Sequence, residues 1–345
     1  GIYVEDQQKD TLVYLNEVYV HFKPLAFLRH GEVHFSHARV VGGRAKMYEV
    51  DSLGVWNYQF VLDAMQSDTA KRDGSFDKML SIRDIQLRDL QIQYQSYGVV
   101  LSQANVDVRC FTRDSIDARI DELAMRMRSS VVDTTSLDIL EFQAHVCKSD
   151  SIFTIPTLRV RTPHSCVDLG GIRFDQRDAS FTVPLKQVEI VPADFALFSA
   201  SCNKLRKIAY VGGELCGTED FIRWDGLAFG YDGERMIRGD VSMRDMRTSP
   251  YLKASLDELH IHMVRLQDIL SRLKGQPMSL PKELLRLGDV RYLGRVEGYV
   301  HDLRLDGALS TDMGRVVTKA SLQSDSAFEH FEYDVQLEAQ HVKLG

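Results

Sequence analysis

The sequence lacks the cysteine patterns that mark zinc-binding or disulfide-bonded proteins. Its 345 residues include only five cysteines, which are widely spaced, odd in number and never arranged as C-x-x-C. A structural zinc site needs ligand pairs at short spacing, and a disulfide framework needs an even set of cysteines. We therefore interpret the cysteines as small apolar side chains, with Cys110 in phase with Val106 and Val108.

Long hydrophobic runs and an excess of positive charge are also missing. The longest apolar stretches reach about eight residues, whereas a membrane-spanning helix needs ~20. The formal net charge is −7, which disfavours nucleic acid or an anionic membrane surface as the main partner, because both attract clustered Lys and Arg.

Motifs of catalysis and of metal binding are scarce. The glycines of 212–217 have P-loop spacing but lack the lysine that binds phosphate, so a turn is favoured there. His34 with His37, and His260 with His262, are metal-like pairs without a third ligand nearby in the sequence. We therefore expect no enzyme activity, no cofactor and no metal site.

Alternation of apolar and polar residues is the main positive feature. Successive side chains on a strand point to opposite faces, so each alternating segment predicts a strand with one apolar face. Between Ile120 and Leu123 the alternation changes phase, which predicts a β-bulge or a bend of the strand. The apolar positions that we assign to one binding surface are Val18, Val20, Phe22, Leu90, Ile92, Tyr94, Val106, Val108, Leu123, Met125, Leu227, Phe229, Leu259 and Ile261.

Helical signals are few and short. Leu266, Ile269, Leu270 and Leu273 have helical spacing and are followed by Gly275 as a terminator. Shorter helical turns are predicted over 136–140, 192–198 and 281–287.

The chain also repeats itself. Gly217, Gly226, Gly233 recur 81 residues later (298 − 217, 307 − 226, 314 − 233) as Gly298, Gly307 and Gly314, and Asp225 recurs as Asp306. Shared glycines between divergent strands are typical of a repetitive β architecture, and we interpret these glycines as turns. The repeated blocks cover about 205–243 and 286–324, within one continuous repetitive β segment over 1–345. A second similarity links 118–127 with 254–263.

Three stretches resemble the TamB group of AsmA-like proteins, the bridge-like lipid-transfer family of the Gram-negative envelope. They are 1–14, with Gly-Ile-Tyr-Val-Glu-Asp leading to Asp-Thr-Leu-Val-Tyr; 162–195, from Thr-Pro-His-Ser to Val-Glu-Ile-Val-Pro-Ala-Asp-Phe; and the duplicated block 205–322. By this resemblance the sequence is an internal section of a longer chain.

The resemblance implies a mainly β fold: an elongated antiparallel sheet, curled into a taco-like groove, with a few short helices. It implies a periplasmic location, with a tether to the inner membrane in a segment outside this sequence. The function implied is phospholipid transfer between the two membranes, outer-membrane protein assembly, or both. The partners would be phospholipid acyl chains and a BamA-type outer-membrane barrel, the latter through parts of the parent chain not present here.

Two other functions remain open. A scaffold or chaperone would bind nascent barrel strands by β-augmentation, in which an added strand pairs with a sheet edge. A structural β-solenoid would instead have a dry interior filled by its own side chains, and alternation alone is also typical of ordinary sandwiches and barrels.

Overall fold

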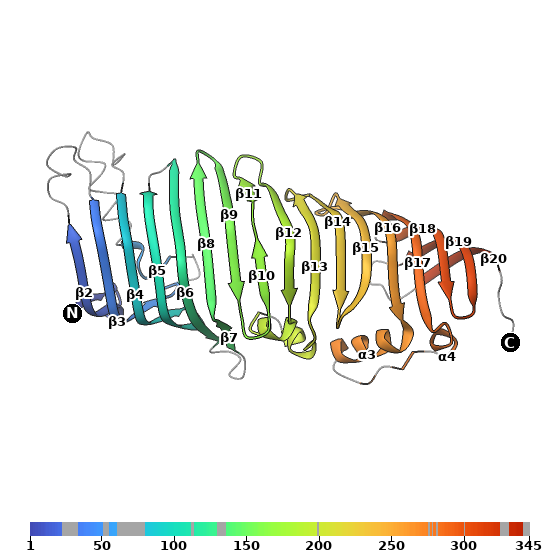
Figure 1. Cartoon of the computed structure of the whole chain (residues 1–345), viewed down its shortest axis with the longest axis horizontal. Coiled ribbons are helices and arrows are strands. Elements are labelled where there is room, and N and C mark those ends of the chain that lie inside the picture. Colours follow the sequence, from blue (N-terminus) through green and yellow to red (C-terminus); the bar gives the residue numbers. More distant parts are fainter. Residues whose placement is uncertain are drawn as a thin grey trace. The chain divides into compact units, whose positions relative to one another are not determined.

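The computed structural model describes residues 1–22, 34–50, 55–60, 80–111, 114–129, 136–198, 200–274, 277, 279–280, 282–299, 301–324 and 331–340. The chain divides into two compact units, Gly1–Gly171 with Asp194–Ser199, and Ile172–Ala193 with Ala200–Gly345. Both units are built mainly of β-strands (Figure 1), so the expected mainly β fold is confirmed.

The first unit is a sheet of long strands that pair mostly in sequence order. All its pairs are antiparallel except β3–β4, which is parallel and makes this sheet mixed rather than purely antiparallel. The strands are β1 (Ile2–Glu5), β2 (Thr11–Phe22), β3 (His34–Met47), β4 (Leu80–Tyr94), β5 (Tyr97–Phe111), β6 (Ser115–Ser129), β7 (Ser136–Ile139), β8 (Glu141–Ser149), β9 (Ile152–Arg161) and β10 (Cys166–Leu169).

The second unit is an antiparallel meander with short helices. Its elements are β11 (Ile172–Asp175), β12 (Ser180–Ile190), η2 (Ala200–Lys204), β13 (Ala209–Gly217), β14 (Phe221–Tyr231), β15 (Glu234–Arg244), β16 (Tyr251–His262), α3 (Met263–Lys274), α4 (Lys282–Leu285), β17 (Asp289–Tyr299), β18 (Asp302–Thr311), β19 (Gly314–Ser324) and β20 (Phe331–Gln340). The short 3-10 helix η1 (Pro192–Phe195) contributes residues to both units.

The longest predicted helix is confirmed as α3, because its apolar residues recur at helical spacing. The predicted turn over 192–198 is confirmed in part by η1, and α4 lies within 281–287. Pro281 and Gly275 lie outside the described residues, as does the side chain of Leu273. No described helix combines the length and the apolar character that crossing a bilayer requires.

The prediction of a helical turn over 136–140 is wrong, because residues 136–139 form strand β7. β7 pairs with one half of β6, over Met125–Arg128, while β8 pairs with the other half, over Ser115–Ile120. A segment of four residues is too short to show a reliable period, so the available partner strand decides its conformation.

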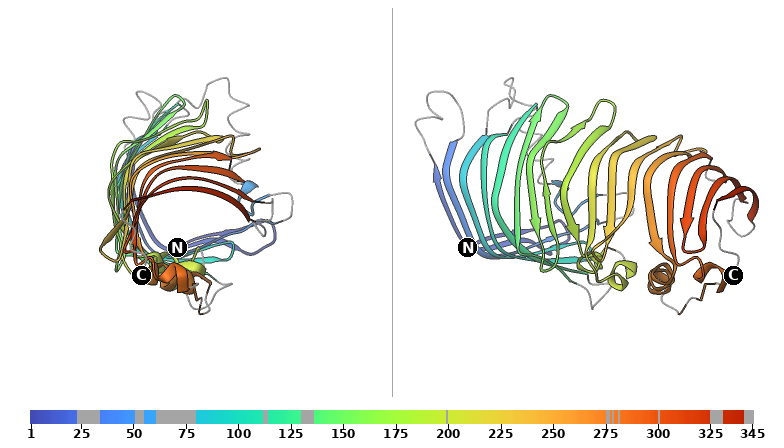
Figure 2. Two further views of the ribbon diagram at one scale, coloured as in Figure 1. Left: turned by 90° about the vertical axis from the view of Figure 1, so that its right-hand side faces the viewer. Right: turned by 45° about the vertical axis from the view of Figure 1, so that its right-hand side comes forward.

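A line of kinks crosses the first unit and bends its strands. Gly42 (φ 69°) and Asp89 (φ 57°) have left-handed backbones at adjacent positions of β3 and β4, with Asn16 on β2 and Ser102 on β5 beside them. The apolar positions change phase at this line on every one of these strands, so the apolar side chains stay on one face. Figure 2 shows the resulting bend of the long strands.

The predicted bulge on β6 is confirmed, at a separate place beside Asn105 and Val106. Asn105 pairs with Glu122 while Val106 pairs with Ile120, which leaves Asp121 as the extra residue. Because of this extra residue, Ile120 and Leu123 lie on the same face of the sheet although they are three residues apart.

In the second unit the repeated glycines lie mostly inside strands, so interpreting all of them as turns is wrong. Gly226 (φ 59°) interrupts β14, and Gly307 pairs with Gly294 in the middle of β18 and β17. Residues 212–217 likewise belong to β13. Gly233 and Gly314 lie at hairpin turns, at the starts of β15 and β19, and Gly217 is the last residue of β13 before the next turn. A kink needs the backbone freedom of glycine as much as a turn does, so composition alone does not separate the two.

The two repeated blocks fold alike. The first forms β13, β14 and β15 and the second forms β17, β18 and β19, each as three consecutive antiparallel strands. The kink near Gly226 in the first block corresponds in sequence to the Gly294–Gly307 contact in the second.

Candidate functional site

One face of the first unit is a continuous apolar surface. A row of facing residues crosses six strands at Val13, Ala45, Ile92, Val99, Met127 and Leu137. The next row on the same face is Leu15, Gly43, Leu90, Leu101, Met125 and Ile139. Residues between these rows, such as Gln91 and Arg44, belong to the opposite face. The register therefore separates an apolar face from a polar face.

Two hydrophobic clusters occupy this apolar face and share members. Leu90, Leu101 and Ala104 are the buried centre of the first cluster. Leu137, Ile139 and Leu197 are the buried centre of the second. Leu123 and Met125 pack against both centres and so join them.

The apolar face is only partly covered. In the described part of the chain, no large side chain has less than 2% of its surface exposed. A globular core of this size normally contains several such residues. The face therefore retains accessible apolar area.

The residues predicted to form the binding surface are placed as follows. Leu90 is buried, whereas Val20 and Tyr94 are 53% and 44% exposed. The side chain of Phe22 lies outside the described residues. The half-buried members in the first unit are Val18, Ile92, Val106, Val108, Leu123 and Met125.

The predicted residues of the second unit share a face of their own sheet. Phe229 pairs with Ile237, which pairs with Leu259, which pairs with Tyr292. Leu227 and Ile261 flank this row and are half-buried. The structure thus brings the predicted residues together within each unit.

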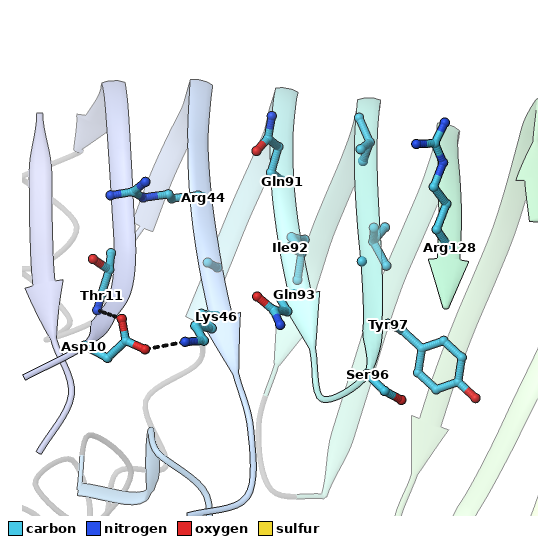
Figure 3. Close-up of a pocket in the computed structure, with 14 residues that line it drawn as sticks. Asp10, Thr11, Arg44, Lys46, Gln91, Ile92, Gln93, Ser96, Tyr97 and Arg128 are labelled. Atoms are coloured by element: carbon cyan, nitrogen blue, oxygen red, sulfur yellow. Dashed lines mark hydrogen bonds and ion pairs between the residues drawn. The ribbon is translucent and has the colours of Figure 1, made fainter. Parts of the chain in front are cut away.

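A hollow of about 560 Å³ lies over β2 to β6 near the β4–β5 turn (Figure 3). Its lining combines the cations Arg44, Lys46 and Arg128 with the amides of Gln91 and Gln93. The same lining includes the apolar side chains Ile92, Val99 and Val100. The sequence pattern did not single out this mixture, because it depends on the alignment of five strands.

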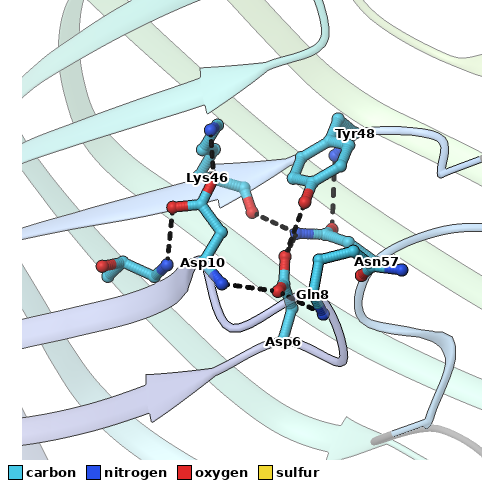
Figure 4. Close-up of polar contacts among 7 residues, drawn as sticks. Asp6, Gln8, Asp10, Lys46, Tyr48 and Asn57 are labelled. Carbon is cyan, nitrogen blue, oxygen red and sulfur yellow. Dashed lines mark hydrogen bonds and ion pairs between the residues drawn. The ribbon is translucent and has the colours of Figure 1, made fainter.

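Next to the hollow, a buried carboxylate fastens the first turn of the chain (Figure 4). Asp6 is 6% exposed and accepts hydrogen bonds from the backbone of Gln8 and Asp10, from Tyr48 Oη at 2.8 Å and from Asn57 Nδ2 at 3.1 Å. The hydrogen bond to Asp6, together with burial, raises the pKa of Tyr48 to about 12. Asp10 in turn forms an ion pair with Lys46.

A second buried carboxylate fastens the segment 162–165 to η1. Asp194 lies within hydrogen-bond distance of Thr162 Oγ1, of Ser165 Oγ at 2.7 Å and of His164 Nδ1 at 2.8 Å. Burial raises the pKa of Asp194, but these hydrogen bonds outweigh burial, and the pKa lies below its ordinary value. Because one carboxylate accepts all these bonds, the arrangement is a structural clamp.

Two of the histidines considered as metal ligands lie in pairs with aspartates, whereas His262 Nδ1 accepts a hydrogen bond from the backbone of Val264. His37 Nδ1 lies 2.7 Å from Asp84, and His260 Nε2 lies 2.8 Å from Asp289. The side chain of His34 lies outside the described residues. Each pair offers two ligand groups.

The five cysteines are free and half-buried. The expectation that Cys110 shares a face with Val106 and Val108 is wrong. The register shifts after Val108, so that Cys110 faces Asp117, a residue of the opposite face.

One mixed cluster escaped the sequence analysis. Asp117 on β6 meets His145 and Cys147 on β8. His145 and Cys147 are two residues apart in the sequence, a spacing that occurs too often to indicate a metal site. Only the pairing of β6 with β8 brings Asp117 to them.

Comparison of the chain with protein families, with curated proteins and with solved structures finds no match.

Proposed function

We propose that the chain is a section of a periplasmic lipid-transfer protein of the TamB-like type, in which the apolar strand faces bind phospholipid acyl chains. The observation that carries this proposal is the joined pair of hydrophobic clusters, which forms a continuous and incompletely covered apolar face. Transfer between inner and outer membranes, and contact with a BamA-type barrel through other parts of the parent chain, follow from the same family resemblance.

The energetics favour a carrier without catalytic groups. Each CH₂ group removed from water gains ~0.8 kcal/mol, so a 16-carbon acyl chain loses roughly 12 kcal/mol on leaving an apolar face for water. Exchange between a bilayer and an apolar face costs far less, because both environments are dry. A continuous apolar face is therefore sufficient for movement of lipid along it.

The matched pair Ile92 and Gln91 tests the proposal. These neighbours lie on opposite faces of β4, Ile92 beside Val99 and Gln91 beside Val100. A photoreactive amino acid at Ile92 of the intact parent protein should give phospholipid adducts in cells, and the same probe at Gln91 should give none. The variant I92E should reduce lipid transfer, whereas Q91E should leave it unchanged.

Three outcomes would contradict the proposal. Protein adducts without lipid would favour a scaffold that binds barrel strands. An Ile92 probe without any adduct would indicate a dry interior. Equal effects of I92E and Q91E would show that the apolar face is not the binding surface.

A further inference from the structure

The polar face of the first unit carries a cluster with three kinds of metal-ligating group. Asp117 on β6 pairs with Cys147 on β8, and Arg119 pairs with His145. The alternate pairs, Ala118 with Val146 and Ile120 with Ala144, belong to the apolar face. The cluster is therefore separate from the proposed lipid-binding surface.

The three ligand atoms converge on one point. Asp117 Oδ1 lies 2.8 Å from His145 Nε2. Cys147 Sγ lies 3.3 Å from the same nitrogen, and all three atoms lie within 4.8 Å of one another. The side chains of His145 and Asp117 are 20% and 35% exposed, so solvent reaches the point where they meet.

This geometry does not suit nucleophilic catalysis. In a Cys-His-Asp relay the thiol and the carboxylate contact opposite nitrogens of the imidazole, so that a proton can pass between them. Here both groups contact Nε2. The thiol and the carboxylate thus share one side of the ring, as groups that coordinate a common ion do.

We propose that Asp117, His145 and Cys147 bind a divalent transition-metal ion of the Zn²⁺ class, with a fourth position open to water. Zinc takes thiolate, imidazole and carboxylate ligands at bond lengths of about 2.0–2.3 Å, which in a tetrahedron places ligand atoms roughly 3.3–3.6 Å apart. The separation of 3.3 Å between Cys147 Sγ and His145 Nε2 lies at the lower end of that range, and the separation of 2.8 Å between His145 Nε2 and Asp117 Oδ1 is about half an ångström shorter. Small rotations of the side chains are enough to admit the ion.

The neighbouring groups indicate moderate affinity. Arg119 is a cation beside the site and disfavours a second positive charge. The two anionic ligands, a carboxylate and a thiolate, compensate for the charge of the ion. Bound metal would link β6 directly to β8. The link lies near the point along β6 where its pairing partner changes from β8 to β7.

Co²⁺ is the appropriate probe, because Co²⁺–thiolate complexes have a near-ultraviolet charge-transfer band that reports the sulfur ligand. The full chain, reduced and stripped of metal, should develop this band on titration with Co²⁺, and Zn²⁺ should abolish it. C147S should lack the band, and H145A should bind Co²⁺ at least roughly tenfold more weakly. C216S, which changes a half-buried cysteine of the second unit, should behave like the unchanged protein.

Absence of the band in the unchanged chain, or its persistence in C147S, would overturn the metal site. Circular dichroism of each variant shows whether the sheet is intact. A rise in the melting temperature on adding Zn²⁺ that is lost in both C147S and H145A, while the folded spectrum is kept, gives an independent readout. The result has no bearing on lipid adducts at Ile92, so the two proposals stand or fall separately.

Discussion

At the scale of single residues, buried carboxylates hold the irregular parts of the first unit. Asp6 and Asp194 are each surrounded by donors, and neither faces a cation as its main partner. Hydrogen bonds to an ionised group are strong, and removing the acceptor leaves several donors unsatisfied.

Replacing Asp194 by Asn should lower the free energy of unfolding by about 1–3 kcal/mol at pH 7. The pKa of Asp194 in the folded state lies below its ordinary value of 3.8. Its stabilisation is therefore present above the unfolded-state pKa and is lost as the pH falls through the folded-state pKa. The difference between D194N and the unchanged chain, measured by urea unfolding, should be constant from pH 7 to about 5 and should shrink below about pH 4. D121N, at an exposed position, is the control, and a pH-independent difference would contradict the assignment.

Tyr48 should titrate later than an ordinary tyrosine. Its folded pKa is raised to about 12 by the hydrogen bond to Asp6, so the stability it contributes is complete below its ordinary pKa and is lost as the pH rises towards 12. Phenolate absorbance should show a late-ionising group that disappears in Y48F and moves towards its ordinary range in D6N. Y19F, at an exposed tyrosine, should keep the late group; an unchanged titration in Y48F would refute the contact.

At the scale of elements, the kinks decide how the strands bend. A methyl group added at Gly294 would lie 2.5 Å from the backbone oxygen of Asp306 and 2.5 Å from Gly307 Cα. Gly226 has a left-handed φ of 59° but open space around the position of an added methyl group. The two glycines are thus required for different reasons. Gly294 allows two strands to approach closely, and Gly226 allows a left-handed backbone conformation.

G294A should therefore destabilise the chain more than G226A. In G226A, an alanine with a left-handed backbone costs about 1–2 kcal/mol. In G294A, the added methyl group also collides with the backbone of β18, and only a movement of β17 away from β18 relieves the collision. We expect G294A to cost roughly 3 kcal/mol or more in total. Urea unfolding of the two variants under identical conditions makes the comparison. Equal losses would mean that the strands separate easily at Gly294.

The sequence predicts the strands well because period-two alternation is a local property. It predicts one kink, the bulge on β6, because the apolar phase changes there within a few residues. The left-handed backbone at Asp89 was missed, although the apolar phase changes there as well, between Leu87 and Leu90. The cluster of Asp117, His145 and Cys147 was also missed, since it depends on β8 pairing with β6 across the intervening β7.

At the scale of the whole molecule, the net charge bears on attraction to lipid headgroups, and the exposed apolar surface bears on binding of acyl chains. The chain is acidic, with a net charge of −7, so a general electrostatic attraction to anionic headgroups is disfavoured. Under the proposed function, its accessible apolar faces take up acyl chains. Lipid binding should then depend on burial of hydrocarbon.

Lipid uptake should accordingly be insensitive to salt. Extraction of a fluorescent phospholipid from neutral vesicles should be as efficient as extraction from vesicles that contain anionic lipid, and raising the salt concentration tenfold should not weaken it. The variant I92E should be defective under all these conditions. Loss of uptake at high salt would point to headgroup attraction, for instance at the hollow lined by Arg44 and Arg128.

The pairing of neighbouring strands in sequence order has a consequence for how the chain folds. A strand that pairs with its predecessor closes only a short loop, and local contacts of this kind favour fast folding. Most of each sheet can therefore grow strand by strand, in the order in which the chain is synthesised, and no apolar segment has to wait for a distant partner. The parallel pair β3–β4 is different, because residues 48–79 separate its two strands. We expect that pair to form last in the first unit, and the sheet before it to remain open until it does.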